Sequence, residues 1–340
     1  MRAPATLLVV LSIIALSGME VVMAKTKAPN WVRATEHAAW APRDSCGEVV
    51  HDGRMWLLGG WFNSNAIGPT DVWSSADGAG WEPVTDAAGW KAGDLPTTVA
   101  HDGRIWLMGG WYAGRLPEGG GSSEVWASAD GMQWECVNAN PGWSPRCGAA
   151  GAVFDGRMWV LGGTEQYFFG DDGDLRNDVW CSADGVTWTQ TAARAPWAPR
   201  AYHAALEFDG RLWVFGGGNY LPTYHGCNDV WSSIDGANWT LVTEHAPWPA
   251  RIWFSAVVYR GCMWVLGGWS NEPSRNWNDV WYSRDGVTWH ELRTETVWSE
   301  RHEHSAYVFN DRLWVVGGNE WPLVNDVWYL ELPEDWRGGG

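Results

Sequence analysis

A short segment near the C-terminus, Arg301-His302-Glu303-His304, holds the residue types of acid–base and metal chemistry. If this segment is a strand, His302 and His304 share one face, because side chains alternate along a strand. Two imidazoles on one face could bind a metal ion, and an imidazole beside a carboxylate could transfer protons. His203 follows another arginine at the same spacing as His304 does. The catalytic candidates are therefore His203, His302, Glu303 and His304.

Five arginines recur three residues after a tryptophan, and their guanidinium groups could hold an anion. Arginine binds carboxylate or sulfate through two parallel hydrogen bonds. If these arginines surround one axis, as the repeat described below indicates, they would ring the mouth of a channel. The candidate ligand-binding arginines are Arg43, Arg146, Arg200, Arg251 and Arg301.

The chain contains 31 tryptophans, far above ordinary usage. Most recur at four positions of the repeat, where large rings can fill the space between neighbouring sheets. Four others lie directly after a Gly-Gly doublet or three residues beyond it, and could stack on a sugar or on a partner's aromatic or proline side chains. The alternative, loops that fold over their own tryptophans, is equally open. These candidate ligand-binding tryptophans are Trp61, Trp111, Trp269 and Trp321.

The element that must position all of these residues is a repeat. The segment HDGRIWLMGG, residues 101–110, has six variants along the chain. The second glycines of the doublets, Gly60, Gly110, Gly163, Gly217, Gly268 and Gly318, lie 50, 53, 54, 51 and 50 residues apart. A period of about fifty residues with several short strands per unit is typical of a β-propeller. Six such units predict one closed six-bladed domain.

Each repeat is predicted to form four antiparallel strands. In the third repeat these are strand a at 149–154, strand b at 157–163, strand c at 178–182 and strand d from 187. An Asp-Gly turn joins a to b, and an SxDGxxW turn joins c to d, since Asp and Gly favour such tight turns. The b–c and d–a links are longer and more varied, and they must lie together on the opposite face. Binding usually belongs to variable loops on a rigid scaffold, so this loop-rich face is where a ligand is expected.

The sixth repeat lacks a strand d of its own. The segment Asn30-Trp31-Val32-Arg33 matches strand d of the other repeats. We therefore expect residues 30–35 to form the outer strand of the sixth blade. This arrangement closes the ring and leaves no long open sheet edge.

The repeats resemble those of the Kelch family. The resemblance rests on an arginine before a hydrophobic strand, the Gly-Gly doublet, an aromatic residue in strand c and a tryptophan in strand d, and it covers residues 31–332. The DVWxSxDGxxW form is similar to Kelch-type proteins of bacterial exported proteomes. The resemblance implies an all-β six-bladed propeller in which the arginine braces blade to blade and the histidines pack. Kelch propellers include protein-binding modules, part of galactose oxidase and sialate mutarotases, and no copper-ligand pattern of the oxidase is present here.

The net charge and the N-terminal segment indicate the class of ligand and the location of the protein. The formal net charge of −17 argues against a nucleic-acid-binding surface. Residues 1–24 have the pattern of a cleaved signal peptide, so the expected domains are 1–24 as signal, 25–336 as propeller and 337–340 as a flexible glycine tail. The protein is accordingly expected to be secreted or periplasmic, with no membrane span. The disulfide pairing of the six cysteines stays open.

These patterns favour a binding or scaffold module that holds a carbohydrate or protein ligand on its loop-rich face. The alternative is a mutarotase or epimerase of sugar acids, similar to the Kelch-type sialate mutarotases, with the arginine ring on the substrate carboxylate. No cofactor or metal is expected, because no CxxC spacing is present and the acidic loop 171–174 lacks the rest of a calcium motif. The oligomeric state is left open.

Overall fold

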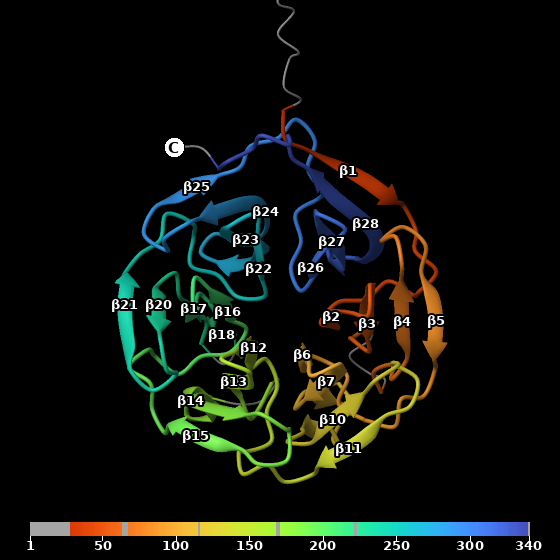
Figure 1. Ribbon diagram of the computed structural model, residues 1–340, viewed down its shortest axis with the longest axis vertical. Helices are drawn as coiled ribbons and strands as arrows, with labels where there is room; N and C mark the ends of the chain where they lie inside the picture. The colour runs from red at the N-terminus through yellow and green to blue at the C-terminus, as the bar shows by residue number, and fades with distance from the viewer. Residues whose placement is uncertain (1–27, 63–66, 115, 168–170, 221–222, 339–340) are drawn as a thin grey trace, which may run out of the picture.

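The computed structural model is a ring of six four-stranded antiparallel sheets around a central axis (Figure 1). It describes residues 28–338, with gaps at 63–66, 115, 168–170 and 221–222. The expected all-β six-bladed propeller is confirmed. In the described part of the chain no helix is long and apolar enough to cross a membrane. The proposed signal peptide, residues 1–24, lies outside the described residues and stays a prediction.

The blades follow one another along the chain. Blade 1 consists of β2 (Gly47–His51), β3 (Arg54–Leu58), β4 (Val72–Ser75) and β5 (Glu82–Thr85). Blade 2 consists of β6 (Thr97–His101), β7 (Arg104–Met108), β10 (Val125–Ser128) and β11 (Glu135–Asn138). Blade 3 consists of β12 (Ala150–Phe154), β13 (Arg157–Thr164), β14 (Leu175–Ser182) and β15 (Thr189–Ala192).

The second half of the ring repeats this pattern. Blade 4 consists of β16 (Ala204–Phe208), β17 (Arg211–Phe215), β20 (Val230–Ser233) and β21 (Trp239–Thr243). Blade 5 consists of β22 (Ser255–Tyr259), β23 (Cys262–Asn271), β24 (Ser274–Ser283) and β25 (Trp289–Glu291). Blade 6 consists of β26 (Ser305–Phe309), β27 (Arg312–Asn319), β28 (Leu323–Glu331) and β1 (Asn30–Thr35).

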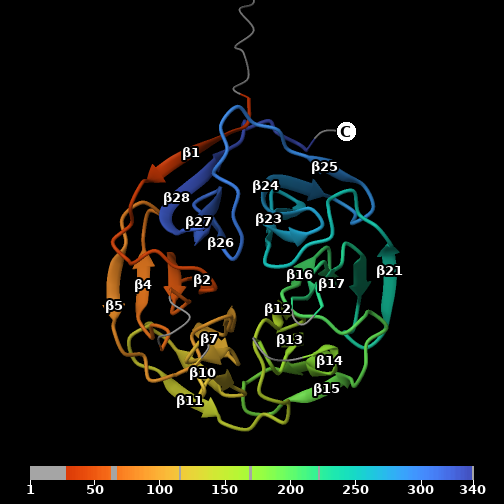
Figure 2. The same ribbon diagram turned by 180° about the vertical axis from the view of Figure 1, so that it is seen from behind.

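The N-terminal strand closes the ring, as expected. β1 pairs antiparallel with β28, with Trp31 opposite Leu330, and the two strands lie side by side in both views (Figures 1 and 2). Trp31 meets Trp298 edge to face at 6.0 Å. The same edge-to-face pair, between a d–a loop tryptophan and the strand-d tryptophan, occurs in the other five blades. β1 therefore completes blade 6 as a native strand d would.

Tryptophans of strand b wedge each blade against the next. The ring of Trp56 in blade 1 lies against Gly131 in the c–d turn of blade 2, where an added Cβ would overlap the ring. The same contact recurs at Trp106, Trp159, Trp213 and Trp314. Blade 6 has no c–d turn, and there the ring of Trp336 lies 5.3 Å from that of Trp264 instead. The expected role of the repeated tryptophans in blade packing is thus observed.

The long b–c links are more ordered than the sequence indicated. Residues 269–278 were expected to form a loop, yet β23 and β24 continue as a hairpin to Asn271 and Ser274. Gly267 and Gly268 adopt φ of 53° and 99°, and the ladder shifts register there and then resumes. Shorter pairs follow the doublet in blades 2 and 4, between β8 (Trp111–Tyr112) and β9 (Gly120–Gly121) and between β18 (Gly218–Asn219) and β19 (His225–Gly226). In blades 2 to 6 the doublet therefore redirects the hairpin and does not end it.

The cysteines form no disulfides. All six lie in the described part of the chain, and all six are free thiols.

Candidate functional site

The repeated arginines are buried and fully engaged. Arg43 donates from Nη1 to Asp71 Oδ1 at 2.6 Å and to the Gly59 carbonyl at 2.9 Å, while its Nη2 lies 3.0 Å from Asp71 Oδ2. The equivalent pairs are Arg146–Asp178, Arg200–Asp229, Arg251–Asp279 and Arg301–Asp326. Each aspartate also accepts the indole N–H of its strand-c tryptophan, as Asp71 does from Trp73. The five guanidinium groups therefore brace strands a, b and c of their own blades, and a ligand carboxylate would have to displace an aspartate to reach them.

The arginine backbone makes the link between blades. The carbonyl of Arg43 accepts a hydrogen bond from the second doublet glycine of the preceding blade, Gly318, at 3.0 Å. The same bond recurs from Gly110 to Arg146, Gly163 to Arg200, Gly217 to Arg251 and Gly268 to Arg301. Blade 2, which has Gly93 in place of the arginine, has Glu124 where the others have aspartate. Blade 2 therefore lacks the arginine and also has glutamate in place of the aspartate that would pair with it.

Two residues beyond each arginine position, a residue with positive φ points to the axis. These six, which we call the axial ring, are Ser45, Leu95, Gly148, Tyr202, Trp253 and Glu303, with φ between 50° and 59°. Their backbones form a chain of hydrogen bonds, in which Leu95 donates to Ser45 at 2.9 Å, Ser45 to Glu303 at 3.1 Å and Glu303 to Trp253 at 2.8 Å. The ring lines one end of a central cavity of about 320 Å³.

One residue before each ring position lies a second set, which bridges to the residue after the Gly-Gly doublet. Its members are Asp44, Asp94, Cys147, Ala201, Ile252 and His302, bridged to Trp61, Trp111, Thr164, Gly218, Trp269 and Asn319. The set is apolar in blades 4 and 5 and carries ionisable side chains in blades 6, 1, 2 and 3. Three of the expected ligand-binding tryptophans therefore serve as backbone partners of this set.

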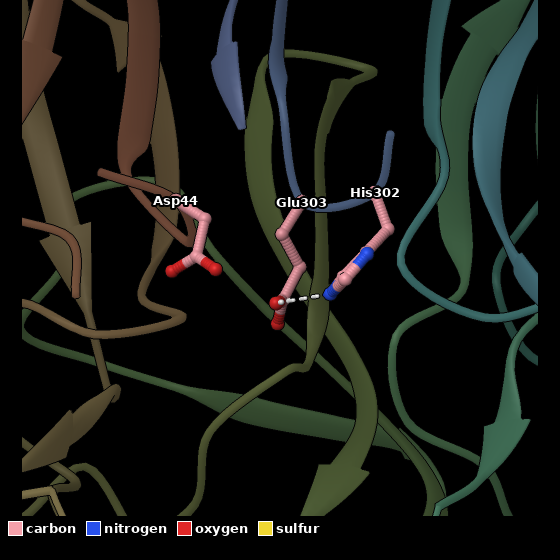
Figure 3. Close-up of side chains that lie close together, drawn as sticks. All are labelled: Asp44, His302 and Glu303. Atoms are coloured by element: carbon pink, nitrogen blue, oxygen red, sulfur yellow. Dashed lines mark ion pairs between the residues drawn. The ribbon is translucent and has the colours of Figure 1, made fainter. Parts of the chain in front are cut away.

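The ionisable side chains of blades 6 and 1 converge. Asp44, His302 and Glu303 each offer a ligand atom within 4.8 Å of the others, and the three side chains point into a shared space (Figure 3). His302 Nε2 lies 3.5 Å from Glu303 Oε2. The phenol of Tyr167 donates to Glu303 Oε1 at 3.5 Å. We call these three residues and the neighbouring Asp94 the axial cluster; Asp94 is outside the group of atoms within 4.8 Å but interacts electrostatically with Asp44 and Glu303.

Burial shifts the titration of the whole cluster. It raises the pKa of Asp44 to about 7, and hydrogen bonds from Asn319 and Ser45 lower it only in part. Burial, with the charges of Asp44 and Asp94, raises the pKa of Glu303 well above its usual range. Burial and the charge of Asp44 do the same to the pKa of Asp94. Burial lowers the pKa of His302 to about 3, so this imidazole is neutral at neutral pH.

The other two candidate histidines face elsewhere. Glu303 has a φ of 51° and β26 begins only at Ser305, so residues 302–304 do not alternate as a strand would. His304 instead lies against Trp298, at 5.1 Å between rings. His203 lies against Trp197 at 5.8 Å. Both histidines line the central cavity, and neither has a hydrogen-bond partner among the described residues. The structure thus brings the His302 and Glu303 side chains together, whereas the rings of His203 and His304 pack against tryptophans.

The four candidate tryptophans divide by exposure. Trp111 is buried, Trp61 and Trp269 are half-buried, and Trp321 is 67% exposed. Trp269 and Trp321 line one cavity of about 410 Å³, together with Ser274, Arg275, Asn276, Glu300 and Glu320. Trp269 is also part of an aromatic cluster with Trp253, Tyr220 and Tyr224. Blades 5 and 6 therefore present the most accessible aromatic pocket of this set.

Two acidic residues of the axial cluster were missed by sequence reasoning. Asp44 and Asp94 stand directly after the arginine position of blades 1 and 2. Aligning the six repeats at that arginine would have shown that His302 shares their position. Nothing in a single repeat indicates that this position faces the axis.

Fold and site together define a six-bladed β-propeller whose blades are braced by arginine–aspartate pairs and joined by tryptophan wedges. Residues 167–337 match the KLHDC2/KLHL20/DRC7 Kelch-repeats domain. The chain belongs to the Kelch-repeat family.

A curated relative shares part of the repeat region. Over 151 residues the chain is 34% identical to the dynein alpha chain of the flagellar outer arm of Chlamydomonas reinhardtii. The match covers 41% of this chain and 3% of the dynein chain. The similarity thus concerns a small part of that protein.

Proposed function

We propose that this protein is a binding module that takes a protein ligand on its loop-rich face, centred on the pocket between Trp269 and Trp321. The observation that carries the proposal is the exposed indole of Trp321, 67% accessible beside the half-buried Trp269. Exposed tryptophans on a rigid base are the side chains that contribute most to protein interfaces. The base is rigid because the hairpins β23–β24 and β27–β28 carry both rings.

The surroundings of the pocket favour a protein over a sugar. Elsewhere on the loop-rich face, Phe62 and Ile67 of the b–c link of blade 1 are 43% and 64% exposed. Arg275 and Glu300 form an ion pair at the pocket and are each less than half exposed. An apolar centre with a charged rim is the usual composition of a protein interface. A carbohydrate ligand that stacks on Trp321 is the competing outcome of the test.

The sugar-acid mutarotase has less support. Such an enzyme needs a free cation for the substrate carboxylate, and the five repeated arginines are each paired with an aspartate. We therefore do not propose catalysis on a sugar acid.

The test is selection of ligands on the folded protein, with Trp321→Ala as the probe. Peptides selected from a phage-displayed library should bind Trp321→Ala about 30-fold more weakly, since an interface tryptophan contributes roughly 2 kcal/mol. Ile234→Ala is the matched control, because Ile234 is 64% exposed but lies in a c–d turn on the opposite face. Selected peptides that bind both variants equally would overturn the proposal. Binding to a glycan array that depends on Trp321 would reassign the pocket to carbohydrate.

A further inference from the structure

The axial cluster has the composition and arrangement of a metal site. We propose that Asp44, His302 and Glu303 bind one divalent first-row transition-metal ion, such as Mn²⁺ or Zn²⁺, with the carboxyl group of Asp94 nearby. The proposed ligands do not line the Trp269–Trp321 pocket, although Asn276 belongs to both sites and the His302 ring lies 5.1 Å from that of Trp321. The inference does not depend on the proposed protein ligand.

The donor atoms already face one another. His302 Nε2, a carboxylate oxygen of Glu303 and a carboxylate oxygen of Asp44 lie within 4.8 Å of one another (Figure 3). Ligand atoms of a tetrahedral or octahedral ion are separated by about 3 to 4 Å, as bond lengths near 2.1 Å require. Small side-chain movements would therefore bring the three atoms onto one ion.

Outer hydrogen bonds orient the imidazole with its free nitrogen toward the cluster. His302 Nδ1 lies 2.7 Å from Asn276 Oδ1, an acceptor, so Nδ1 carries the proton and donates. The Asn276 amide is held in this orientation because its Nδ2 donates to the Asn319 carbonyl at 2.9 Å. Nε2 is therefore left with its lone pair, which is the form that binds a metal. Histidine ligands in metal sites are typically fixed in this way.

The same outer shell orients Asp44. Asn319 Nδ2 donates to Asp44 Oδ2 at 3.0 Å and leaves Oδ1 without a partner among the described residues. An asparagine therefore holds Nδ1 of His302 and Oδ2 of Asp44, and the atoms available to a metal ion are Nε2 and Oδ1.

A second observation points to a ligand in the cluster. Asp94 is 3% exposed, and neither of its carboxylate oxygens forms a hydrogen bond of normal distance and angle with a described residue; the Ser45 side chain lowers the pKa of Asp94 only in part. Buried carboxyl groups without partners are rare, because desolvation is costly unless a donor or a cation compensates it. A divalent ion held by Asp44, His302 and Glu303 would compensate the charge of this neighbouring buried carboxyl group.

The fold itself does not require polar residues here. Ala201 and Ile252 occupy the same register position in blades 4 and 5, and both are fully buried. Blades 4 and 5 nevertheless have the arginine–aspartate pair, the Gly-Gly doublet and a residue of the axial ring. The polar half of the set is therefore an addition to the scaffold, placed where blades 6, 1 and 2 meet.

The donor types select the metal. One imidazole nitrogen with two carboxylates suits Mn²⁺, Fe²⁺ or Zn²⁺. Ca²⁺ prefers six to eight oxygen ligands, and an imidazole in the first coordination sphere disfavours it.

The first test measures Mn²⁺ and Zn²⁺ binding to the full chain by calorimetry after chelation and dialysis. We expect one ion per chain, and at least a 10-fold loss of affinity in Asp44→Asn and His302→Ala. Glu48→Gln is the matched control, because Glu48 is a carboxyl group of the central cavity outside the cluster, and its pKa is also raised by burial, to about 8. Absence of binding, or equal affinity in the cluster variants and the control, would overturn the proposal.

The second test keeps the native sequence and so does not depend on how the variants fold. Electron spin-echo spectroscopy of the Mn²⁺-loaded protein should detect coupling to a single coordinated imidazole nitrogen. Metal binding without imidazole coupling would place the ion elsewhere and overturn the assignment.

Discussion

At the scale of single residues, the position in the repeat decides what each side chain does. The c–d turn glycine is one example, since it provides positive φ and also receives the strand-b tryptophan of the preceding blade. Gly131 has a φ of 71°, and an added Cβ would overlap the Trp56 ring. Gly103, in an a–b turn, has a φ of 68° with nothing near its Cβ position. Comparing substitutions at Gly131 and Gly103 therefore separates the cost of positive φ from the cost of disturbed packing between blades.

Gly131→Ala should destabilise the protein much more than Gly103→Ala. Alanine with positive φ costs about 1–2 kcal/mol, which both variants experience. Gly131→Ala also displaces Trp56 and should add about 1–3 kcal/mol, typical of an overpacked core. Urea unfolding of both variants measures the difference. Equal losses would show that Trp56 shifts freely and that the wedge contributes little.

The buried imidazole of His203 should make the stability of the propeller sensitive to acid. Burial, and secondarily the charge of Arg200, lower the pKa of His203 to about 3, while Asp229 raises it in part. The folded pKa lies below the ordinary value of 6.5. The stabilisation from keeping this imidazole neutral is therefore fully present above pH 6.5 and is lost as the pH falls toward 3.

His203→Phe should reduce this acid sensitivity. Phe254 occupies the same position in blade 5, so a phenyl ring fits the repeat. Between pH 6.5 and 4 the variant should lose about 1.4 kcal/mol less stability per pH unit than the parent. Denaturant unfolding at several pH values measures this, with the exposed His245→Phe as control. Parallel pH profiles for parent and His203→Phe would contradict the assigned pKa shift.

At the scale of elements, β1 connects the two ends of the chain. Its ladder with β28 and the Trp31–Trp298 contact replace the covalent c–d turn that the other blades have. A closed ring protects every sheet edge between neighbouring blades. Loss of β1 therefore exposes the edge of β28 and leaves blade 6 joined to blade 1 only through contacts such as the Trp314–Gly78 wedge and the Gly318–Arg43 hydrogen bond.

Trp31→Ala should destabilise the ring by about 3–5 kcal/mol, as for other buried tryptophans. Arg33→Ala, which removes an exposed side chain of the same strand that contacts the Trp328 ring and Glu36, should change stability by less than about 1 kcal/mol. Thermal unfolding followed by tryptophan fluorescence compares the two. Deletion of residues 25–40 should abolish the cooperative transition, and a truncated protein that melts like the parent would disprove closure by β1.

At the scale of the whole molecule, six similar blades produce a symmetric scaffold with an asymmetric centre. The brace and the wedges recur around the ring, with Gly93 and Trp336 as local departures. The position next to each brace varies from aspartate to isoleucine. Differences that are modest in any one repeat become a cluster because the ring brings them to a common axis.

The sequence by itself determined the fold. The fifty-residue period, the Asp-Gly turns and the strand-d match at Trp31 are local patterns, and each blade can be read from its own residues. β1, β26 and the order of strands in the ring follow from them directly. The orientation of the arginines could not be predicted with the same certainty, because their aspartate partners lie 25 to 32 residues away.

Only the tertiary structure decided the candidate sites. Asp44 and His302 lie near opposite ends of the chain, and closure by β1 places blades 1 and 6 side by side so that these residues meet. Positive φ at Glu303 turns its carboxylate toward them and His304 away, which no alternation rule predicts. Exposure likewise separates Trp321 from Trp111, although both follow a doublet. The physical reason is common to all three cases: strand patterns depend on neighbours in sequence, whereas the axis of a propeller is formed by residues from every blade.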